Sequence, residues 1–254
     1  MDVYWLEQTE ADVPEENDWL SPAEAVFLGR LRFAKRRADW RLGRWTAKRA
    51  LAVYLNSLCP LQTFAQIEIC PAPSGAPEVF FESRLAPVAI SLSHRNGRAI
   101  CAVAPAGVNL GCDLELIEPH SPAFITDYFT VEEKAMVMRQ SMDERPWLLA
   151  VLWSGKESAV KALRAGLRLD TRSVIVRPRE VPFGLNGWNP LQVRYTGGQI
   201  FDGWWQGAGH MVRTIVAAPP PGSPIPLGSF MPGRPTKCVV PTMSIQTARD
   251  RGFA

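Results

Sequence analysis

The sequence predicts an α+β protein, loosely α/β, with two lobes of similar size and a proline-rich tail. Three observations favour this class. Apolar residues recur at helical spacing in several segments, short strand-like segments alternate with them, and helices followed by strands occur in both halves. With 254 residues, 46% of them hydrophobic, the chain is long enough to bury a core. We expect an N-terminal lobe over 1–106, a C-terminal lobe over 107–218 and the tail over 219–254, with no internal repeat of residue identity.

The N-terminal lobe is expected to begin with two helices. The sequence Ser-Pro-Ala-Glu at 21–24 is a capping box with proline at the first helical position, which predicts a helix that breaks or bends near Arg36. A second helix follows and ends at Cys59-Pro60. Its apolar residues at helical spacing are Ala47, Leu51, Tyr54, Leu55 and Leu58.

The rest of the chain alternates between strands and helices. Short runs of apolar and β-branched residues between turn signals predict strands over 66–70, 88–92, 99–104, 108–116, 173–177, 191–195, 199–205 and 211–217. Helical periodicity predicts helices over 130–140 and 146–165, the latter stopped by Gly166. Seven prolines lie between Pro219 and Pro235, so we expect an extended tail, either wrapped on the protein or loose.

The N-terminal segment indicates the compartment. It is acidic and lacks the basic and apolar regions of a secretory signal, and no apolar run approaches the roughly 20 residues that span a bilayer. The five cysteines form no CxxC pair, which suggests reduced thiols. We therefore expect a soluble cytoplasmic protein.

The charges are unevenly distributed, although the net charge is only +3. Residues 1–24 contain eight acidic residues and no lysine or arginine, whereas residues 30–49 contain nine basic residues and one acidic residue, Asp39. Such a basic cluster favours an anionic ligand, which could be a phosphate, a nucleic acid or an acidic protein surface.

The strand over 108–116 contains the sequence Gly-Cys-Asp-Leu-Glu at 111–115. Side chains at i and i+2 of a strand project from the same face, so Asp113 and Glu115 lie side by side. Their mutual repulsion costs stability unless a cation lies between them, and oxygen ligands near phosphates favour Mg²⁺. The alternative is a solvated edge of the sheet.

A second informative segment is Trp-Ser-Gly-Lys-Glu-Ser-Ala-Val-Lys at 153–161. Glu157 and Lys161 are four residues apart, which by itself is a common surface ion pair worth about 0.3–0.5 kcal/mol. The helix is otherwise nearly all apolar, which instead favours placing these charges in an interior cleft.

Together the two segments resemble the signature of the Sfp-type 4′-phosphopantetheinyl transferases, G-x-D-x-E followed about 40 residues later by W-x-x-K-E-[AS]-x-x-K. The sequence fills every position, with Gly111, Asp113, Glu115, Trp153, Lys156, Glu157, Ser158 and Lys161. Residues 128–133 resemble the family's F-[FS]-x-x-E element, residues 91–94 its Ser-His motif and residues 33–48 its basic helix. The resemblance spans about residues 27–177.

The resemblance implies an enzyme of two lobes related by an approximate two-fold axis, with coenzyme A between them. The family transfers the phosphopantetheine arm of coenzyme A to a serine of an apo acyl, peptidyl or polyketide carrier protein and releases adenosine 3′,5′-bisphosphate. Asp113, Glu115 and Glu157 would then hold Mg²⁺ against the pyrophosphate, which Lys161 also faces. Such a single-chain pseudo-dimer is expected to act as a monomer, without nucleic acid or membrane.

Further roles follow from the same resemblance. Glu133 is the candidate to help deprotonate the serine, with Glu132 as its neighbouring alternative, although Thr130 to Glu133 is also a capping box. The residues expected to contact coenzyme A are Arg37, Arg44, Lys48, Ser93, His94, Lys156 and Lys161. Among them, Arg37, Arg44 and Lys48 are the candidates for its 3′-phosphate. The family's G-K-P segment appears here as Gly75-Ala76-Pro77, so a lysine that would contact the adenosine part is missing. Arg84 or a basic-helix residue is the candidate to replace it.

Two alternatives remain open. A homologue that binds coenzyme A or carrier proteins without catalysis would keep the fold, but its unneutralised carboxylates would destabilise the site. A nucleic-acid binder could use the basic helix, in which Trp40 and Trp45 are interleaved with arginines, but the pI of 8.7 is modest and no known nucleic-acid module is visible. No phosphate-binding glycine loop supports a nucleotide kinase.

Overall fold

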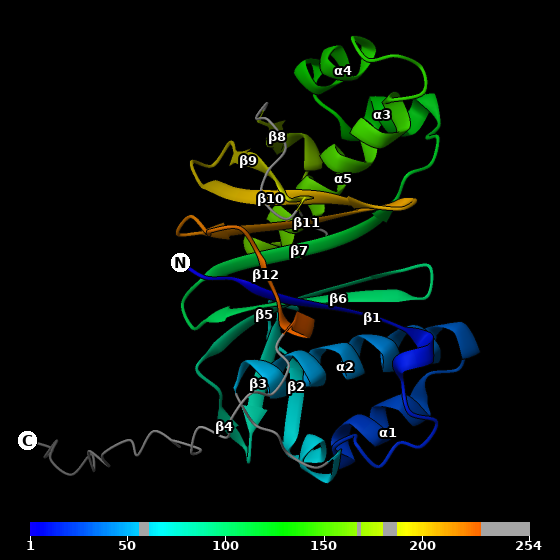
Figure 1. Ribbon diagram of the computed structural model, residues 1–254, viewed down its shortest axis with the longest axis vertical. Coiled ribbons are helices and arrows are strands. Elements are labelled where there is room, and N and C mark those ends of the chain that lie inside the picture. The colour runs from blue at the N-terminus through cyan, green and yellow to red at the C-terminus, as the bar shows by residue number, and fades with distance from the viewer. Residues whose placement is uncertain (56–60, 167–168, 180–186, 230–254) are drawn as a thin grey trace, which may run out of the picture.

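The computed structural model describes residues 1–55, 61–166, 169–179 and 187–229 (Figure 1). Two β-sheets pack against each other, and a long helix covers the outer face of each. The protein is therefore α+β, as predicted. In the described ranges no helix is long and apolar enough to span a membrane.

The N-terminal half combines a four-stranded sheet, a three-stranded sheet and two helices. Its elements are β1 (Tyr4–Thr9), α1 (Pro22–Arg30), α2 (Ala34–Tyr54), β2 (Ile67–Pro71), β3 (Pro77–Phe81), β4 (Arg84–Leu85), β5 (Val88–Arg95) and β6 (Arg98–Pro105). The larger sheet has the order β12-β1-β6-β5, and α2 packs on its outer face, whereas β2, β3 and β4 form the smaller sheet.

The C-terminal half contains one five-stranded sheet and three helices. Its elements are β7 (Asn109–Leu116), α3 (Pro122–Tyr128), α4 (Val131–Met138), α5 (Arg145–Ala162), β8 (Val174–Pro178), β9 (Asn189–Tyr195), β10 (Ile200–Ala208), β11 (Met211–Ala218) and β12 (Ile225–Pro226). The antiparallel sheet has the order β7-β11-β10-β9-β8, and α5 covers it, while β12 returns to pair with β1 in the other sheet.

The alternation of side chains along the strands builds three apolar layers. In β6, Ile100 and Ala102 pack between the sheets, whereas Cys101 and Val103 face α2. In β7, Cys112 and Leu114 join the layer between the sheets. The residues that alternate with them, which include the two predicted acidic residues, therefore project toward α5.

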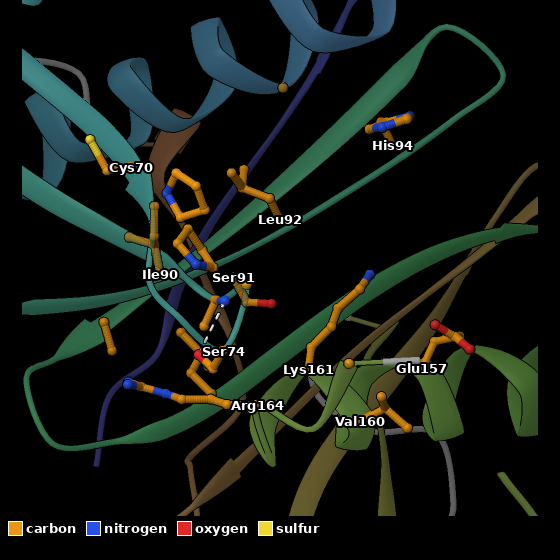
Figure 2. Close-up of a pocket in the computed structure, with 18 of the residues that line it drawn as sticks. Cys70, Ser74, Ile90, Ser91, Leu92, His94, Glu157, Val160, Lys161 and Arg164 are labelled. Carbon is orange, nitrogen blue, oxygen red and sulfur yellow. Dashed lines mark hydrogen bonds between the residues drawn. The ribbon is translucent and has the colours of Figure 1, made fainter. Parts of the chain in front are cut away.

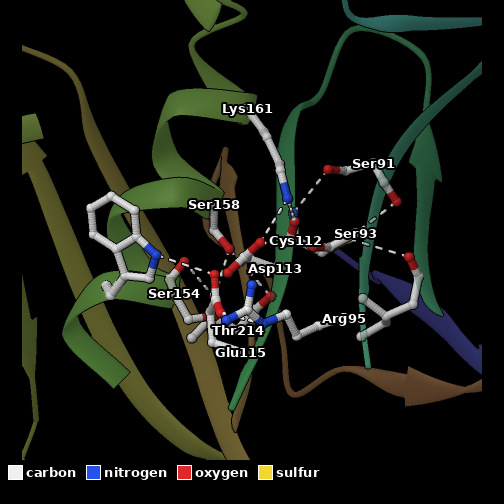
Figure 3. Close-up of polar contacts among 12 residues, drawn as sticks. Ser91, Ser93, Arg95, Cys112, Asp113, Glu115, Ser154, Ser158, Lys161 and Thr214 are labelled. Carbon is white, nitrogen blue, oxygen red and sulfur yellow. Dashed lines mark hydrogen bonds and ion pairs between the residues drawn. The ribbon is translucent and has the colours of Figure 1, made fainter. Parts of the chain in front are cut away.

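The helix α5 lies close to β7 and β11 because of a glycine and a buried polar cluster. A Cβ atom on Gly111 would lie 1.8 Å from the carbonyl oxygen of Ser158, so only glycine fits at this contact. The hydroxyl of Thr214 is 2.9 Å from Ser154 Oγ and 2.6 Å from Ser158 Oγ (Figure 3). These contacts fix α5 against the acidic strand.

Several sequence predictions need correction. The first helix ends at Arg30 and a new one begins at Ala34, so the break lies before Arg36 rather than near it. The strands β1 and β3 and the helix α3 were not predicted. The second helix ends at Tyr54, before the predicted end at Cys59-Pro60. The tail segment 219–229 is wrapped on the protein through β12, and residues 230–254 lie outside the described residues.

Candidate active site

A cavity of about 470 Å³ lies between the two halves of the protein (Figure 2). Its walls come from α2, the turn between β2 and β3, the strand β5 and the C-terminal half of α5. Four of the residues predicted to form the site line this cavity: Arg44, His94, Glu157 and Lys161. The structure thus brings the basic helix, the Ser-His strand and the W-x-x-K-E helix together around one space.

Asp113 lies beside this cavity, on the face of β7 that meets α5 (Figure 3). Its Oδ1 accepts hydrogen bonds from Lys161 Nζ and from Ser93 Oγ, each at 2.8 Å. Its Oδ2 is buried and has no hydrogen-bond partner in the described part of the chain. Since a buried carboxylate oxygen without a partner is costly, this atom marks a position for a missing positive charge.

Glu115 lies two residues further along the same face. Its Oε1 accepts a hydrogen bond from Trp153 Nε1 at 3.1 Å, and Arg95 Nε lies 3.5 Å from its Oε2. Burial and the negative charge of Asp113 raise the pKa of Glu115 to about 7. Burial and Asp113 also raise the pKa of Glu157 on α5. Asp113 therefore repels both glutamates in the space between β7 and α5.

This set of carboxylates fits a divalent cation in its chemistry. A cation would pair with Asp113 Oδ2 and relieve the repulsion that raises the pKa of Glu115 and Glu157. In the arrangement shown, Lys161 and Arg95 neutralise part of the charge, and no group of three Asp, Glu, His or Cys side chains in the described segments is already gathered to hold a metal ion. Binding would therefore require these basic side chains to give way.

The raised pKa of Glu115 predicts how the stability of the metal-free protein depends on pH. The folded-state pKa of about 7 exceeds the ordinary value of 4.5, so the folded state holds the proton more tightly. The protonated Glu115 therefore contributes to the free energy of unfolding below pH 4.5, by at most about 3 kcal/mol. This stabilisation is lost as the pH rises through 7. We expect Glu115→Gln to flatten the pH dependence of thermal unfolding between pH 5 and 7 in EDTA. Superimposable profiles for the two proteins would contradict this assignment.

Lys161 lies one helical turn after Glu157 and lines the cavity. Its ammonium donates to the carbonyl oxygen of Cys112 at 3.0 Å as well as to Asp113. Burial disfavours its charge, but Asp113 and the other negative groups around it outweigh burial and raise the pKa of Lys161. It is therefore a positive charge fixed between the acidic strand and the cavity.

The Ser-His motif on β5 faces the acidic strand across the sheet interface. Ser91 Oγ accepts a hydrogen bond from the backbone nitrogen of Cys112 at 2.9 Å, and Ser93 binds Asp113. Ser93 therefore orients a carboxylate in this arrangement, while His94 lines the cavity. Burial and the nearby Lys161 lower the pKa of His94 against the opposing effect of Asp39.

The three predicted basic ligands on α2 lie in three different places. Arg44 lines the cavity, stacks on Trp40 at 5.1 Å from the ring centroid and lies 3.7 Å from Glu24. Arg37 lies instead against a separate cavity of about 270 Å³ beside α1. Lys48 is fully buried, and its ammonium pairs with Glu24 at 2.5 Å. The structure therefore brings only Arg44 to the cavity.

Glu133 and Lys156 form a fully buried ion pair at 2.8 Å. Glu133 Oε2 also accepts from the backbone of Thr130 in a capping box, and its Oε1 accepts from the backbone nitrogen of Val176 at 3.0 Å. Lys156 donates to two backbone carbonyl groups and has a pKa lowered by burial. Both predicted site residues thus lie inside the C-terminal half, and neither lines the cavity.

The N-terminal half contains the same arrangement a second time. Glu24 forms a capping box with Ser21, accepts from the backbone nitrogen of Ile69 at 3.3 Å and pairs with the buried Lys48. In both halves the lysine follows a tryptophan by three residues, at Trp45 and Trp153. The two halves therefore share a structural repeat that includes these buried ion pairs, although the sequence shows no extended repeat of residue identity.

Because the arrangement is repeated, we expect the buried Glu24 and Glu133 to contribute equally to the free energy of unfolding. Glu24→Gln and Glu133→Gln would each leave a buried lysine without its carboxylate, which costs about 3 kcal/mol or more. We expect similar losses in the free energy of unfolding, measured by urea titration. Glu132→Gln is the matched control, because Glu132 is exposed and pairs only with the exposed Arg177. A loss at Glu133 no larger than that at Glu132 would contradict the structural role.

The sequence reasoning missed two arginines that the structure places at the site. Arg95 lies against Glu115, and Arg164 lines the cavity beyond the end of α5. Arg95 directly follows the Ser-His motif, so its position was a usable signal. Arg164 follows Lys161 by three residues, but the helix was expected to continue past it to Gly166, and nothing in the pattern distinguished it from a surface arginine.

Comparison with known families agrees with this fold and site. Residues 109–212, which run from the start of β7 into β11, match the model of the 4′-phosphopantetheinyl transferase superfamily. This part of the chain is a domain of that superfamily, so the resemblance that the motifs indicated is confirmed at the superfamily level. No curated protein matches the sequence significantly. The match includes the acidic strand and α5, and it supports a role in phosphopantetheine transfer.

Proposed function

We propose that this protein transfers the 4′-phosphopantetheine arm of coenzyme A to a serine of an apo carrier protein in a Mg²⁺-dependent reaction. The observation that carries the proposal is the cavity between the halves, where Arg44 and His94 face Glu157 and Lys161 beside the acidic strand. In the reaction the serine oxygen bonds to the phosphorus that bears the pantetheine arm. The bond from that phosphorus to the bridging oxygen breaks, and adenosine 3′,5′-bisphosphate leaves.

The acidic residues supply the metal site in this proposal. Asp113, Glu115 and Glu157 would hold Mg²⁺, which when bound would stabilise negative charge on the pyrophosphate. The orphaned Oδ2 of Asp113 and the raised pKa values of the two glutamates support this assignment. Lys161 would exchange its contact with Asp113 for the substrate's phosphate, where its fixed positive charge stabilises the leaving group.

The proton of the attacking serine requires an acceptor. Glu133 has no exposed surface, and each of its oxygens accepts a hydrogen bond inside the protein, so we assign it to holding α4, α5 and β8 together. Glu157 is the carboxylate among the catalytic candidates that lines the cavity, and we assign it the proton. A carboxylate has two oxygens, so one can contact the metal ion while the other accepts the proton.

Arg32, Arg36 and Arg37 of the basic cluster are exposed, but other members of the cluster are engaged within the protein, which weighs against a nucleic-acid surface along the whole helix. A phosphate backbone needs free, exposed cations. Arg41 donates instead to backbone carbonyl groups of the acidic N-terminal segment, Lys35 pairs with Asp39 at 3.0 Å, and Lys48 is buried. Trp40 lines the cavity rather than projecting as a stacking platform.

The experiment is to incubate the protein with coenzyme A, Mg²⁺ and a panel of apo carrier proteins, then to measure the intact mass of each carrier. We expect one carrier or more to gain a single phosphopantetheine unit, and EDTA to prevent the gain. Replacing the carrier's acceptor serine by alanine is the matched control. Binding of coenzyme A without transfer to any carrier would support the non-catalytic homologue instead, and no binding of coenzyme A would overturn the proposal.

A further inference from the structure

Arg164 is a charged residue of the cavity that none of the assignments above uses. It lies two residues beyond the last residue of α5, and its side chain lines the cavity along the side formed by Ser74 (Figure 2). The guanidinium makes no hydrogen bond or ion pair with any residue in the described ranges.

The other basic groups of the cavity already have acidic partners. Arg44 lies 3.7 Å from Glu24, and Lys161 pairs with Asp113 at 2.8 Å. Among the cavity residues that the structure describes, Arg164 is therefore the arginine or lysine whose charge is not balanced by a carboxylate. A guanidinium next to a cavity and without a partner is suited to a phosphate, which it can bind through two parallel hydrogen bonds.

The backbone at this position makes the choice of arginine informative. Arg164 has a φ of 54°, in the left-handed region that favours glycine, and the position just past a helix C-cap is where glycine is most common. Glycine would fit this backbone without strain. The chain thus has an arginine at a position where the backbone conformation favours glycine.

The turn next to Arg164 in the cavity wall consists of uncharged residues. The turn between β2 and β3 presents Ser74, Gly75 and Ala76 to the cavity, and Ser74 Oγ accepts from the backbone nitrogen of Ala76 at 3.4 Å. A Cβ atom on Gly166 would lie 4.0 Å from the carbonyl oxygen of Ser74, so this turn is adjacent to the segment that carries Arg164. The guanidinium therefore supplies the positive charge at this end of the cavity.

We propose that Arg164 binds the 3′-phosphate of coenzyme A. This assignment rests on the proposed function, which places the pyrophosphate beside Lys161 and Asp113. Arg164 lies three residues after Lys161, just past the end of α5, and both side chains line the same cavity, so a second phosphate group of the same ligand is the anion that fits Arg164. The sequence analysis expected Arg37, Arg44 and Lys48 at this phosphate, and of these three residues Arg44 lines the cavity.

The test compares the binding of coenzyme A and 3′-dephospho-coenzyme A by titration calorimetry. The proteins are the native chain, Arg164→Gly, Arg164→Lys and the control Arg84→Ala, which removes one exposed arginine outside the cavity. For Arg164→Gly we expect affinity for coenzyme A to fall about tenfold and affinity for the dephospho ligand to change less than twofold. Arg164→Lys should retain part of the affinity, and Arg84→Ala should bind like the native protein.

Thermal unfolding separates this role from a structural one. Because glycine relieves the strained backbone, Arg164→Gly should unfold at the same temperature as the native protein or higher. Equal losses for both ligands would overturn the phosphate assignment, and native affinity in Arg164→Gly would overturn any binding role. If the native protein bound neither ligand, both the proposed function and the role of Arg164 would be overturned. If the native protein bound coenzyme A and Arg164→Gly bound it equally well, only the role of Arg164 would be contradicted.

Discussion

Asp113→Asn is expected to reduce phosphopantetheine transfer by about 10³-fold or more, to the limit of detection by mass measurement. The substitution keeps the shape of the side chain and an oxygen that can accept from Ser93 and Lys161. It removes the negative charge of the one carboxylate that raises the pKa of both Glu115 and Glu157. The proposed metal ion would lose its central ligand, while the cavity that holds coenzyme A would remain.

The measurement is a time course of carrier modification with saturating coenzyme A and a titration of Mg²⁺. A thermal shift with Mg²⁺ provides an independent readout, because ligand binding to the folded state stabilises it and the variant should show no such shift. Asp113→Ala should behave in the same way. Ser93→Ala is the control, because it removes one hydrogen bond to Asp113 without changing the charge. Turnover within tenfold of the native rate in Asp113→Asn would exclude this residue from the metal site.

The sequence predicts the acidic strand and α5 well because their signals are local. Side-chain alternation places Asp113 and Glu115 on one face without knowledge of the sheet, and the capping box at Ser21 fixes the start of α1. The break between α1 and α2 was misplaced for a physical reason. No glycine or proline marks residues 31–33, so the extended backbone there has no strong local signal.

The burial of charged side chains was not predictable from the same patterns. Lys48 and Arg44 are both basic residues of one amphipathic helix, yet Lys48 reaches inward to Glu24 and Arg44 reaches the cavity. The difference depends on the position of α1, which is a tertiary contact. Likewise, the capping box of Thr130 and Glu133 was visible in the sequence, but the ion pair between Glu133 and Lys156 was not.

The internal repeat explains why these burials were missed. Aligning Trp45 and Trp153 shows that each is followed at the third position by a lysine, which pairs with the capping glutamate of a preceding helix. A repeat of only a few identities separated by about 100 residues is hidden in a single sequence and becomes apparent once the two helices occupy equivalent layers. In this chain, therefore, Lys156 is part of the scaffold, whereas Glu157 and Lys161 line the cavity.

Gly111→Ala is expected to cause the largest loss of stability of any single methyl addition at the site. The new Cβ atom would lie 1.8 Å from the carbonyl oxygen of Ser158 and 3.0 Å from the backbone nitrogen of Ala162. Both contacts are with the backbone of α5, so no rotamer change relieves them. The helix must move away from β7, which separates Ser158 from Thr214 and opens the packing between the sheet and α5.

We expect a loss of more than about 3 kcal/mol in the free energy of unfolding, which is a large fraction of the total stability of a typical domain. Urea or thermal unfolding followed by circular dichroism measures it. Gly43→Ala is the matched control, because Gly43 lies within α2, its Cβ position has no atom within 4 Å, and alanine favours a helix by up to about 1 kcal/mol. Any Gly111→Ala protein that folds should also bind Mg²⁺ less well, because Glu157 and Lys161 move with α5 away from Asp113. Native stability in this variant would show that α5 does not approach the acidic strand as closely as described, and the geometry of the proposed metal site would fail with it.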